Sequence, residues 1–215
     1  MIPSRSSLSG WPLLGAIAIA VLAMTGLAIA AQADLVDGVH SAVRATARSS
    51  FALFLLAFTA SAFAVLLPGT AGAALLRERR YLGLGFAFSH LVHAVLIYAY
   101  GRLAPEFWPG RSGLANLPGT IGYAFLLAMT ITSFKPVARR MSATAWKRLH
   151  TAGMWVLAAV FALSYFKRIP MSPAYALPFA LLTAAVAIRV LGKFAQANKR
   201  RQRDARAPTA ALRSP

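Results

Sequence analysis

Residues 79–93 read RRYLGLGFAFSHLVH and open an apolar run that continues to Tyr100. Two arginines precede the run, and two histidines, His90 and His93, lie three residues apart inside it. A run of about 20 apolar residues is long enough to cross the hydrocarbon core of a bilayer, about 30 Å thick. Polar side chains inside such a span are costly and mark functional sites. The stretch therefore predicts a membrane-spanning helix that carries two functional imidazoles.

Similar apolar runs occur along the rest of the chain. They cover residues 11–31, 50–67, 81–100, 120–134, 149–166 and 174–188, the last continuing to Leu191. The chain is 58% hydrophobic with a mean hydropathy of +0.60, and only 13% of its residues are charged, against about 25% in soluble domains. We therefore expect an all-α protein, an integral membrane bundle of about six transmembrane helices.

The first run raises the alternative of a cleaved signal peptide, because it ends in AIAAQAD, which resembles an A-x-A cleavage site. It is longer than the usual apolar core of about 7–15 residues, which favours an uncleaved span. We therefore expect the chain to consist of three segments. These are an N-terminal segment over residues 1–10, the membrane domain over 11–192, and a basic tail over 193–215 that is disordered past Arg206. Residues 32–48 are expected to form a loop, and Ser142 is expected to cap the fifth span.

The basic residues predict the orientation of the bundle. Lysines and arginines number three in residues 68–80, five in 135–148 and seven in 193–213, against two in each of the opposite loops. Basic loops stay on the cytoplasmic side, so both termini are predicted to be cytoplasmic, with the protein multi-pass in a bacterial inner membrane. The net charge of +18 fits anionic lipid, and no basic and aromatic pattern indicates nucleic acid.

The absence of cysteine excludes disulfides, thiolate metal sites, iron–sulfur clusters and covalent haem attachment. No glycine-rich nucleotide fingerprint follows a strand-like segment, so no NAD or flavin domain is encoded here. A flavin or quinone could still take part, but no recognisable motif encodes its binding.

The histidines are few and their positions are informative. His90 and His93 share one helix face, with Gly83 on the same face seven residues earlier. His150 opens the fifth span, with Gly153 on its face, and glycines let a helix or a flat ligand approach closely. Facing imidazoles on separate helices fit axial ligation of a b-type haem. Zinc fits less well, because it needs three or four ligands and the spans offer no carboxylate. The alternative to a metal site is that the histidines form structural hydrogen bonds within the bundle.

Two motifs resemble those of a known family. Arg79-Arg80-Tyr81-Leu82-Gly83-Leu84 with Phe88 and His93 resembles the RR-x-LGL-x-x-x-F…H signature of the MsrQ/YedZ haem-binding membrane subunits, which belong to the ferric reductase-like transmembrane group. Trp146-Lys147-Arg148-Leu149-His150 is similar to the W-x-x-LH motif of the same subunits, and the resemblance covers about residues 50–190.

The resemblance implies a site for haem b, one and at most two. It places His93 and His150 as axial ligands of the haem iron. His90 is an extra histidine three residues before the family position, and we expect it to be an alternate or second-site ligand. A further family histidine, thirteen residues after His150, is replaced here by Leu163. The flanking basic residues would anchor the membrane surface and could meet haem propionates: Arg79, Arg80, Arg139, Arg140, Lys147 and Arg148.

The function implied is an electron-transfer subunit of an oxidoreductase system, without a catalytic residue of its own. Electrons would come from a quinol or a flavoprotein and leave to a periplasmic partner such as a molybdopterin reductase. The alternative from another class is a haem-free membrane scaffold or assembly subunit of the same fold. A proton-coupled transporter is disfavoured because no acidic residue falls inside an apolar run; the acids are Asp34, Asp37, Glu78, Glu106 and Asp204.

Overall fold

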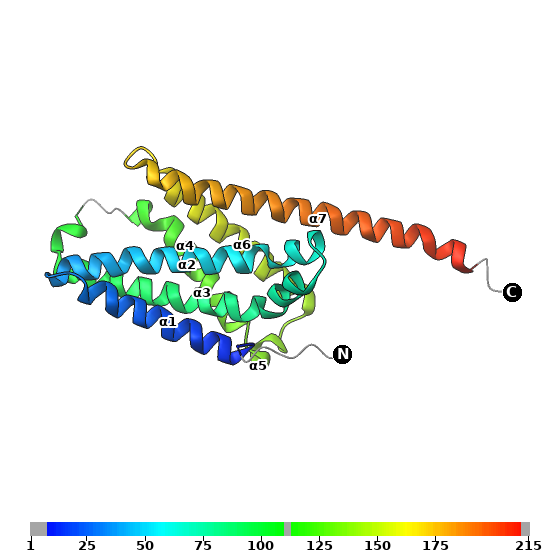
Figure 1. The fold of residues 1–215 in the computed structure, drawn as a ribbon, viewed down its shortest axis with the longest axis horizontal. Helices are drawn as coiled ribbons and strands as arrows, with labels where there is room; N and C mark the ends of the chain where they lie inside the picture. The colour runs from blue at the N-terminus through cyan, green and yellow to red at the C-terminus, as the bar shows by residue number, and fades with distance from the viewer. Residues whose placement is uncertain (1–7, 110–112, 212–215) are drawn as a thin grey trace.

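The computed structural model describes residues 8–109 and 113–211, and these residues form a bundle of long helices (Figure 1). The helices are α1 (Trp11–Ala30), α2 (Leu35–Leu66), α3 (Thr70–Leu103), α4 (Gly113–Ile131), α5 (Lys135–Ala138), α6 (Ala143–Phe166) and α7 (Ala176–Ala211), with short 3-10 turns η1 (Pro105–Phe107) and η2 (Pro173–Tyr175). The predicted all-α class is confirmed.

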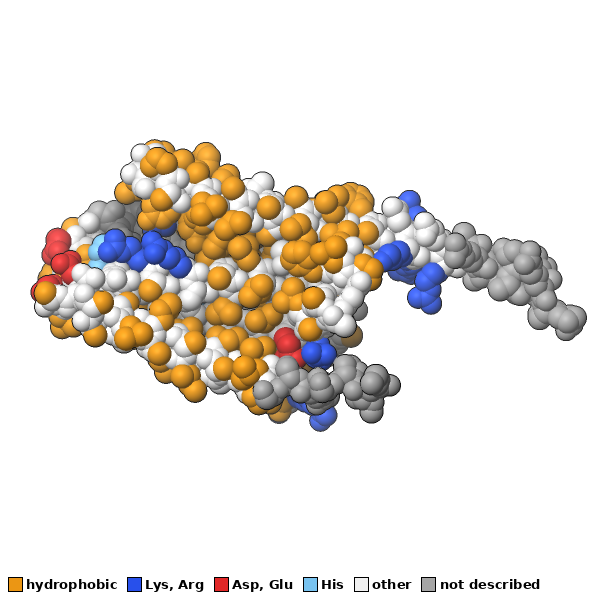
Figure 2. Space-filling view, viewed as in Figure 1, with side chains coloured by type: hydrophobic (Ala, Val, Ile, Leu, Met, Phe, Trp, Pro, Cys, Tyr) orange, Lys and Arg blue, Asp and Glu red, His pale blue; other side chains and the backbone are white. Residues whose placement is uncertain are grey.

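Five of these helices are long and apolar enough to cross a membrane: α1, α2, α3, α6 and α7 with its preceding turn. The sixth, α4, has a shorter apolar part over residues 116–131. Figure 2 shows hydrophobic side chains over the middle of the visible face, with charged side chains toward its two ends. Exposed apolar side chains in a band between charged ends are what a lipid-facing surface requires.

Helices α2 and α3 are longer than the sequence predicts. Residues 32–48 are not a loop, because α2 starts at Leu35, where the Asp34 side chain accepts hydrogen bonds from the backbone N–H groups of Val36 and Asp37 at 2.8 and 3.1 Å. A cap of this kind satisfies the free N–H groups of the first turn. At 1.5 Å per residue, α2 and α3 are each about 50 Å long and extend beyond the hydrocarbon core.

The C-terminal helix α7 runs to Ala211. The disorder predicted past Arg206 stays a prediction, and residues 212–215 lie outside the described residues. Figure 1 shows α7 extending well past the other helices, at the same end of the bundle as the start of α1. The predicted cap at Ser142 is confirmed, since its hydroxyl accepts from Ala145 N–H at 3.1 Å. The predicted fourth run ends early: α4 stops at Ile131, and residues 132–134 turn toward α5.

Aromatic side chains fill the centre of the bundle where α2, α3 and α6 meet. Phe54 and Phe58 are completely buried, and Phe54 packs against Phe86 and Phe161 with ring centroids 5.6 and 5.0 Å apart. Burying a side chain of this size contributes about 1.5–3 kcal/mol relative to leaving it in water. This aromatic layer lies between the two groups of histidines described next.

Candidate functional site

His90 and His93 lie side by side on α3, as their spacing predicts. Their rings are stacked, with centroids 5.4 Å apart and planes 28° apart. The ring of Tyr123 from α4 stacks on His90 at 4.8 Å, and Phe86 and Phe161 lie within 5.4 and 6.1 Å of the same imidazole. We call the surroundings of His90 and His93 the distal level.

The imidazole of His93 is held by α2. Its Nδ1 lies 3.1 Å from the carbonyl oxygen of Val43 and 3.1 Å from the hydroxyl of Thr46. A carbonyl oxygen can only accept, so Nδ1 carries the proton and Nε2 keeps its lone pair. Histidines that bind metals commonly hold the other ring N–H in this way. The arrangement leaves His93 chemically ready to act as a ligand.

His90 is enclosed differently. Its Nδ1 is buried and has no hydrogen-bond partner among the residues that the structure describes. The hydroxyl of Tyr123 donates to the backbone carbonyl of His90 at 3.3 Å and not to the ring. A buried polar atom without a partner costs about 1–3 kcal/mol. The ring is therefore held by aromatic packing, at a cost in stability.

His150 lies in the second turn of α6, far from the other two histidines. Its Nε2 is 3.0 Å from the hydroxyl of Thr132, and its ring stacks on Trp146 with centroids 4.0 Å apart. The Thr132 hydroxyl donates its own hydrogen to the carbonyl of Ala128 at 2.7 Å, so it accepts from His150 Nε2–H. The lone pair of the neutral ring is then on Nδ1. A hydrogen bond thus orients His150 as one orients His93, here to Thr132, which directly follows α4.

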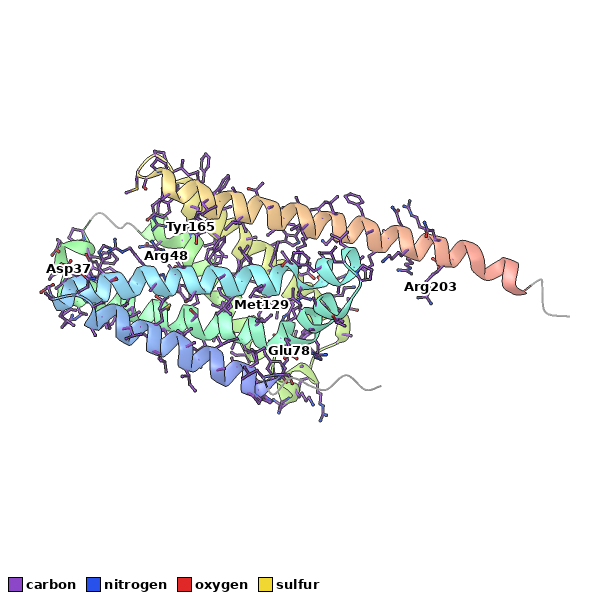
Figure 3. All side chains as sticks on the ribbon, in the orientation of Figure 1. Asp37, Arg48, Glu78, Met129, Tyr165 and Arg203 are labelled. Carbon is purple, nitrogen blue, oxygen red and sulfur yellow. The ribbon has the colours of Figure 1, made fainter. Side chains whose placement is uncertain are left out.

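A cavity of about 890 Å³ adjoins His150. Drug-sized and cofactor-sized ligands occupy cavities of about 300–1,000 Å³. Its apolar wall includes Leu84, Phe86, Leu126, Met129 and Met154, and Figure 3 labels Met129 toward the middle of the bundle. Its cations come from α3, α5, α6 and α7: Arg77, Arg79, Arg80, Lys135, Lys147, Arg189 and Lys193. We call this region the cavity level.

Of the two glycines predicted to clear space, one does so. Gly83 lines the cavity, and a Cβ atom at this position would meet no other atom within 4 Å. Gly153 instead lets the side chain of Met129 pack directly against α6, because a Cβ atom there would overlap the methionine. Open space at Gly83 belongs to the cavity, whereas the space at Gly153 is filled.

The two levels are well separated. Phe161, which packs against His90, lies eleven residues after His150 on α6, a rise of about 16 Å. His90 and His93 do not line the cavity, whereas Arg79, Arg80 and Gly83 of the same helix do. The structure therefore brings His90 and His93 together and places His150 apart from both, so His93 and His150 do not face each other. In Figure 3, Tyr165 and Arg48 mark the end of the bundle opposite Glu78.

Leu163 does not point toward the histidines. Its side chain is 46% exposed on the outside of α6, while Phe161 occupies the position that packs against His90. Among the residues that the structure describes, no group of three or more His, Cys, Asp or Glu side chains could hold a metal ion. A haem iron takes only one or two ligands from the protein, so it does not need a group of three ligating side chains.

Arg189 is a residue that the sequence reasoning passed over, because it lies at the end of an apolar run near the basic tail. It is only 6% exposed, and its Nη1 donates a hydrogen bond to the backbone carbonyl of Phe58. Its guanidinium lies over the rings of Phe58 and Trp155, 4.3 and 5.8 Å from their centroids. The available signal was a single arginine between apolar neighbours, the pattern that marks a functional position in a span.

An integral membrane helix bundle with histidines inside its spans is therefore the class to which this chain belongs. The family described as the ferric reductase like transmembrane component matches residues 46–161, more than half of the chain. The protein belongs to this family. No curated protein and no solved structure matches the chain. The matched segment includes the three histidines of α3 and α6 and ends before Leu163 and α7.

Proposed function

We propose that this protein is a membrane b-type cytochrome that passes electrons across the bilayer. Membership of the ferric reductase-like family indicates membrane electron transfer, and proteins of this family generally bind haem. The observation that carries the proposal is the cavity beside His150, which combines an oriented imidazole, an apolar wall and an excess of cations. These are the three features that a haem with two carboxylates needs.

The residues around the cavity fit a haem. His150 would supply a ring nitrogen to hold the haem, with Thr132 accepting from the other ring N–H and Trp146 stacking on the ring. Two other soft donors line the cavity, the buried thioethers of Met129 and Met154. Gly83 leaves room for the macrocycle. When bound, haem supplies one-electron chemistry, and the protein supplies ligation, burial and control of the potential.

The distal level offers a second group of candidate ligands. A second haem there would take His93, whose Nε2 lone pair is free, as its ligand, with His90 as the alternate. Aromatic rings fill the space around His90, and Leu163 stands where the family has a histidine. One haem, at the cavity level, is therefore the content that we propose, with two as the upper limit.

The direction and the partners follow from the likeness to MsrQ/YedZ subunits. We propose that electrons enter from a quinol or a flavoprotein at the cytoplasmic side. They would leave to a periplasmic redox protein such as a molybdopterin reductase. Both termini would be cytoplasmic in a bacterial inner membrane, since the loops on that side are the more basic.

A difference spectrum of the purified protein tests the proposal. The protein is expressed with haem supplied, purified in detergent, and examined in reduced and oxidised states, with a pyridine haemochrome assay for haem type and amount. We expect a b-type signal near one haem per chain, lost in His150→Ala. A protein that carries no b-type haem under these conditions overturns the proposal. A haem content halved in His93→Ala, with His90→Ala unchanged, would reveal a second haem bound by His93.

A haem-free scaffold is the second candidate, favoured by one observation. His93 and His150 both hydrogen-bond within the bundle, to Val43 and Thr132, as structural histidines do. In that case His150→Ala would lower the stability of the protein, and no spectral change would accompany it.

A further inference from the structure

Two arginines from helices far apart in the sequence meet on one turn of α2. Arg79 of α3 donates from Nε to the carbonyl of Ala57 at 3.1 Å, and Arg189 of α7 donates from Nη1 to the adjacent carbonyl of Phe58. Both arginines line the cavity beside His150. Their attachment to neighbouring carbonyls brings two positive charges to the same side of the cavity.

No acid balances these charges within the described part of the chain. The ion pairs there are Arg77–Glu78 and Arg200–Asp204, and the cavity lining contains no aspartate or glutamate. Arg189 is more than nine-tenths buried, and its Nε lacks a hydrogen-bond partner among the described residues. A buried unpaired charge is strongly destabilising, so such charges pair with a counter-ion. Among the described residues, the cavity therefore presents these two cations and no acid to balance them.

The shape of the cavity defines the kind of anion. The wall beyond the arginines is apolar, with Leu84, Leu126 and Met154, so the ligand has a hydrophobic body and an anionic end. A guanidinium presents N–H donors in a planar fork that matches the two oxygens of a carboxylate. Two arginines and two carboxylates would balance in charge. An anionic lipid headgroup offers related chemistry but lacks the flat body that open space at Gly83 admits.

We propose that Arg79 and Arg189 bind the two carboxylates of the haem in this cavity, an inference that rests on the proposed function. Arg189 lies outside the segment that matches the family, which ends at Phe161. The chain therefore completes its cofactor site with α7, a helix added to the matched core. Carboxylate binding neutralises the buried Arg189 and the half-buried Arg79, and ties α7 to α2 and α3 through the ligand.

The experiment compares haem with its dimethyl ester, in which both carboxylates are blocked. Apo-protein in detergent is titrated with each ligand, and binding is followed by the Soret absorbance and by quenching of tryptophan fluorescence. We expect the free acid to bind the wild-type protein about 10- to 100-fold more tightly than the ester, as charge-assisted hydrogen bonds predict. In Arg189→Gln and in Arg79→Gln this ratio falls toward one, and Arg189→Lys gives an intermediate value.

Matched controls are Arg201→Gln on the exposed part of α7 and Arg102→Gln at the far end of α3, both expected to keep the wild-type ratio. The wild-type comparison needs no variant, so it stands even if Arg189→Gln fails to fold. Equal binding of acid and ester overturns the inference and leaves the cytochrome proposal intact. Failure of both ligands to bind overturns the cytochrome proposal itself. Competition by phosphatidylglycerol, lost in Arg189→Gln, together with equal binding of acid and ester, would assign the arginines to lipid and overturn the inference.

Discussion

The cavity level and the distal level of this bundle use histidine in opposite ways. At the cavity level His150 borders about 890 Å³ of space with seven basic side chains around it. At the distal level His90 and His93 are stacked on each other and packed against Tyr123 and Phe86. The helices and the residue types are similar at both levels. The difference shows that a histidine within a span indicates a ligand site most strongly when it borders an open cavity whose charged side chains need a partner of opposite charge.

Removal of His150 is the most severe test of this difference. His150→Ala removes the nitrogen donor at the cavity level, and we expect complete loss of the b-type signal, measured by the pyridine haemochrome assay. The matched control is His40→Ala, because His40 stacks on Tyr100 at 5.0 Å and lies outside the cavity. If His150→Ala kept its full haem content, the haem would be bound at the distal level and not beside His150.

A side chain that fills the cavity should cause the next largest loss of bound haem. Gly83→Phe places a ring in open space, so the helix should tolerate it while most of the bound haem is lost. Gly15→Phe, on the exposed face of α1, is the neutral control, since a Cβ atom there also meets nothing. Gly85→Phe is the contrasting variant: its Cβ would lie 2.9 Å from Ile17 Cγ2, so it should destabilise the packing of α1. Haem content per folded protein is the measurement, and unchanged content in Gly83→Phe would show that the cavity is not the haem site.

The acceptor of the His150 N–H gives a smaller effect. Thr132→Val keeps the side-chain volume and removes the hydroxyl, so the His150 ring loses its orientation. Outer-shell changes of this kind lower metal affinity about 10- to 100-fold, and we expect a fall in haem affinity within that range. Thr46→Val makes the same change beside His93 and should leave the affinity at the cavity unchanged. Titration of each apo-protein with haem gives the affinity of each variant. An equal fall in haem affinity in Thr132→Val and Thr46→Val would show that the two levels do not differ.

The smallest effect concerns the buried ring of His90. Its Nδ1 has no partner in the described part of the chain, so His90→Leu removes an unsatisfied polar atom and fills a similar volume. We expect the apo-protein to gain about 1–3 kcal/mol in the free energy of unfolding. Denaturant unfolding in mixed micelles gives this quantity, with His93→Leu as the contrast, because His93 would lose the bonds to Val43 and Thr46. A loss of stability in His90→Leu would mean that its ring nitrogen is satisfied in the folded protein.

The sequence was sufficient for the apolar centres of the helices, because a span must be apolar over its whole length. It was less informative about where helices end. Residues 35–49 carry Asp37, Arg44 and Arg48 and resemble a loop in composition, yet they continue α2 because Asp34 caps its first turn. Propensity and capping decide such polar extensions, and hydropathy does not detect them.

The histidines of the candidate site were predictable from the sequence, whereas Arg189 and the arrangement of the site were not. His90, His93 and His150 follow from motif and spacing, and so does the open space at Gly83. The depth of each histidine depends on how α3 and α6 are aligned, and that alignment places Arg79 and Gly83 beside His150, with Phe161 beside His90. No local pattern encodes a relative shift of two packed helices.

The sequence by itself determined that the chain is a membrane helix bundle of the ferric reductase-like kind, because long apolar runs and two short motifs are local properties. Only the tertiary structure decided that the histidines lie at two levels and that Arg79 and Arg189 share one turn of α2. Residues 110 positions apart come together through the packing of α3 and α7 on α2, which depends on side-chain fit across all three helices.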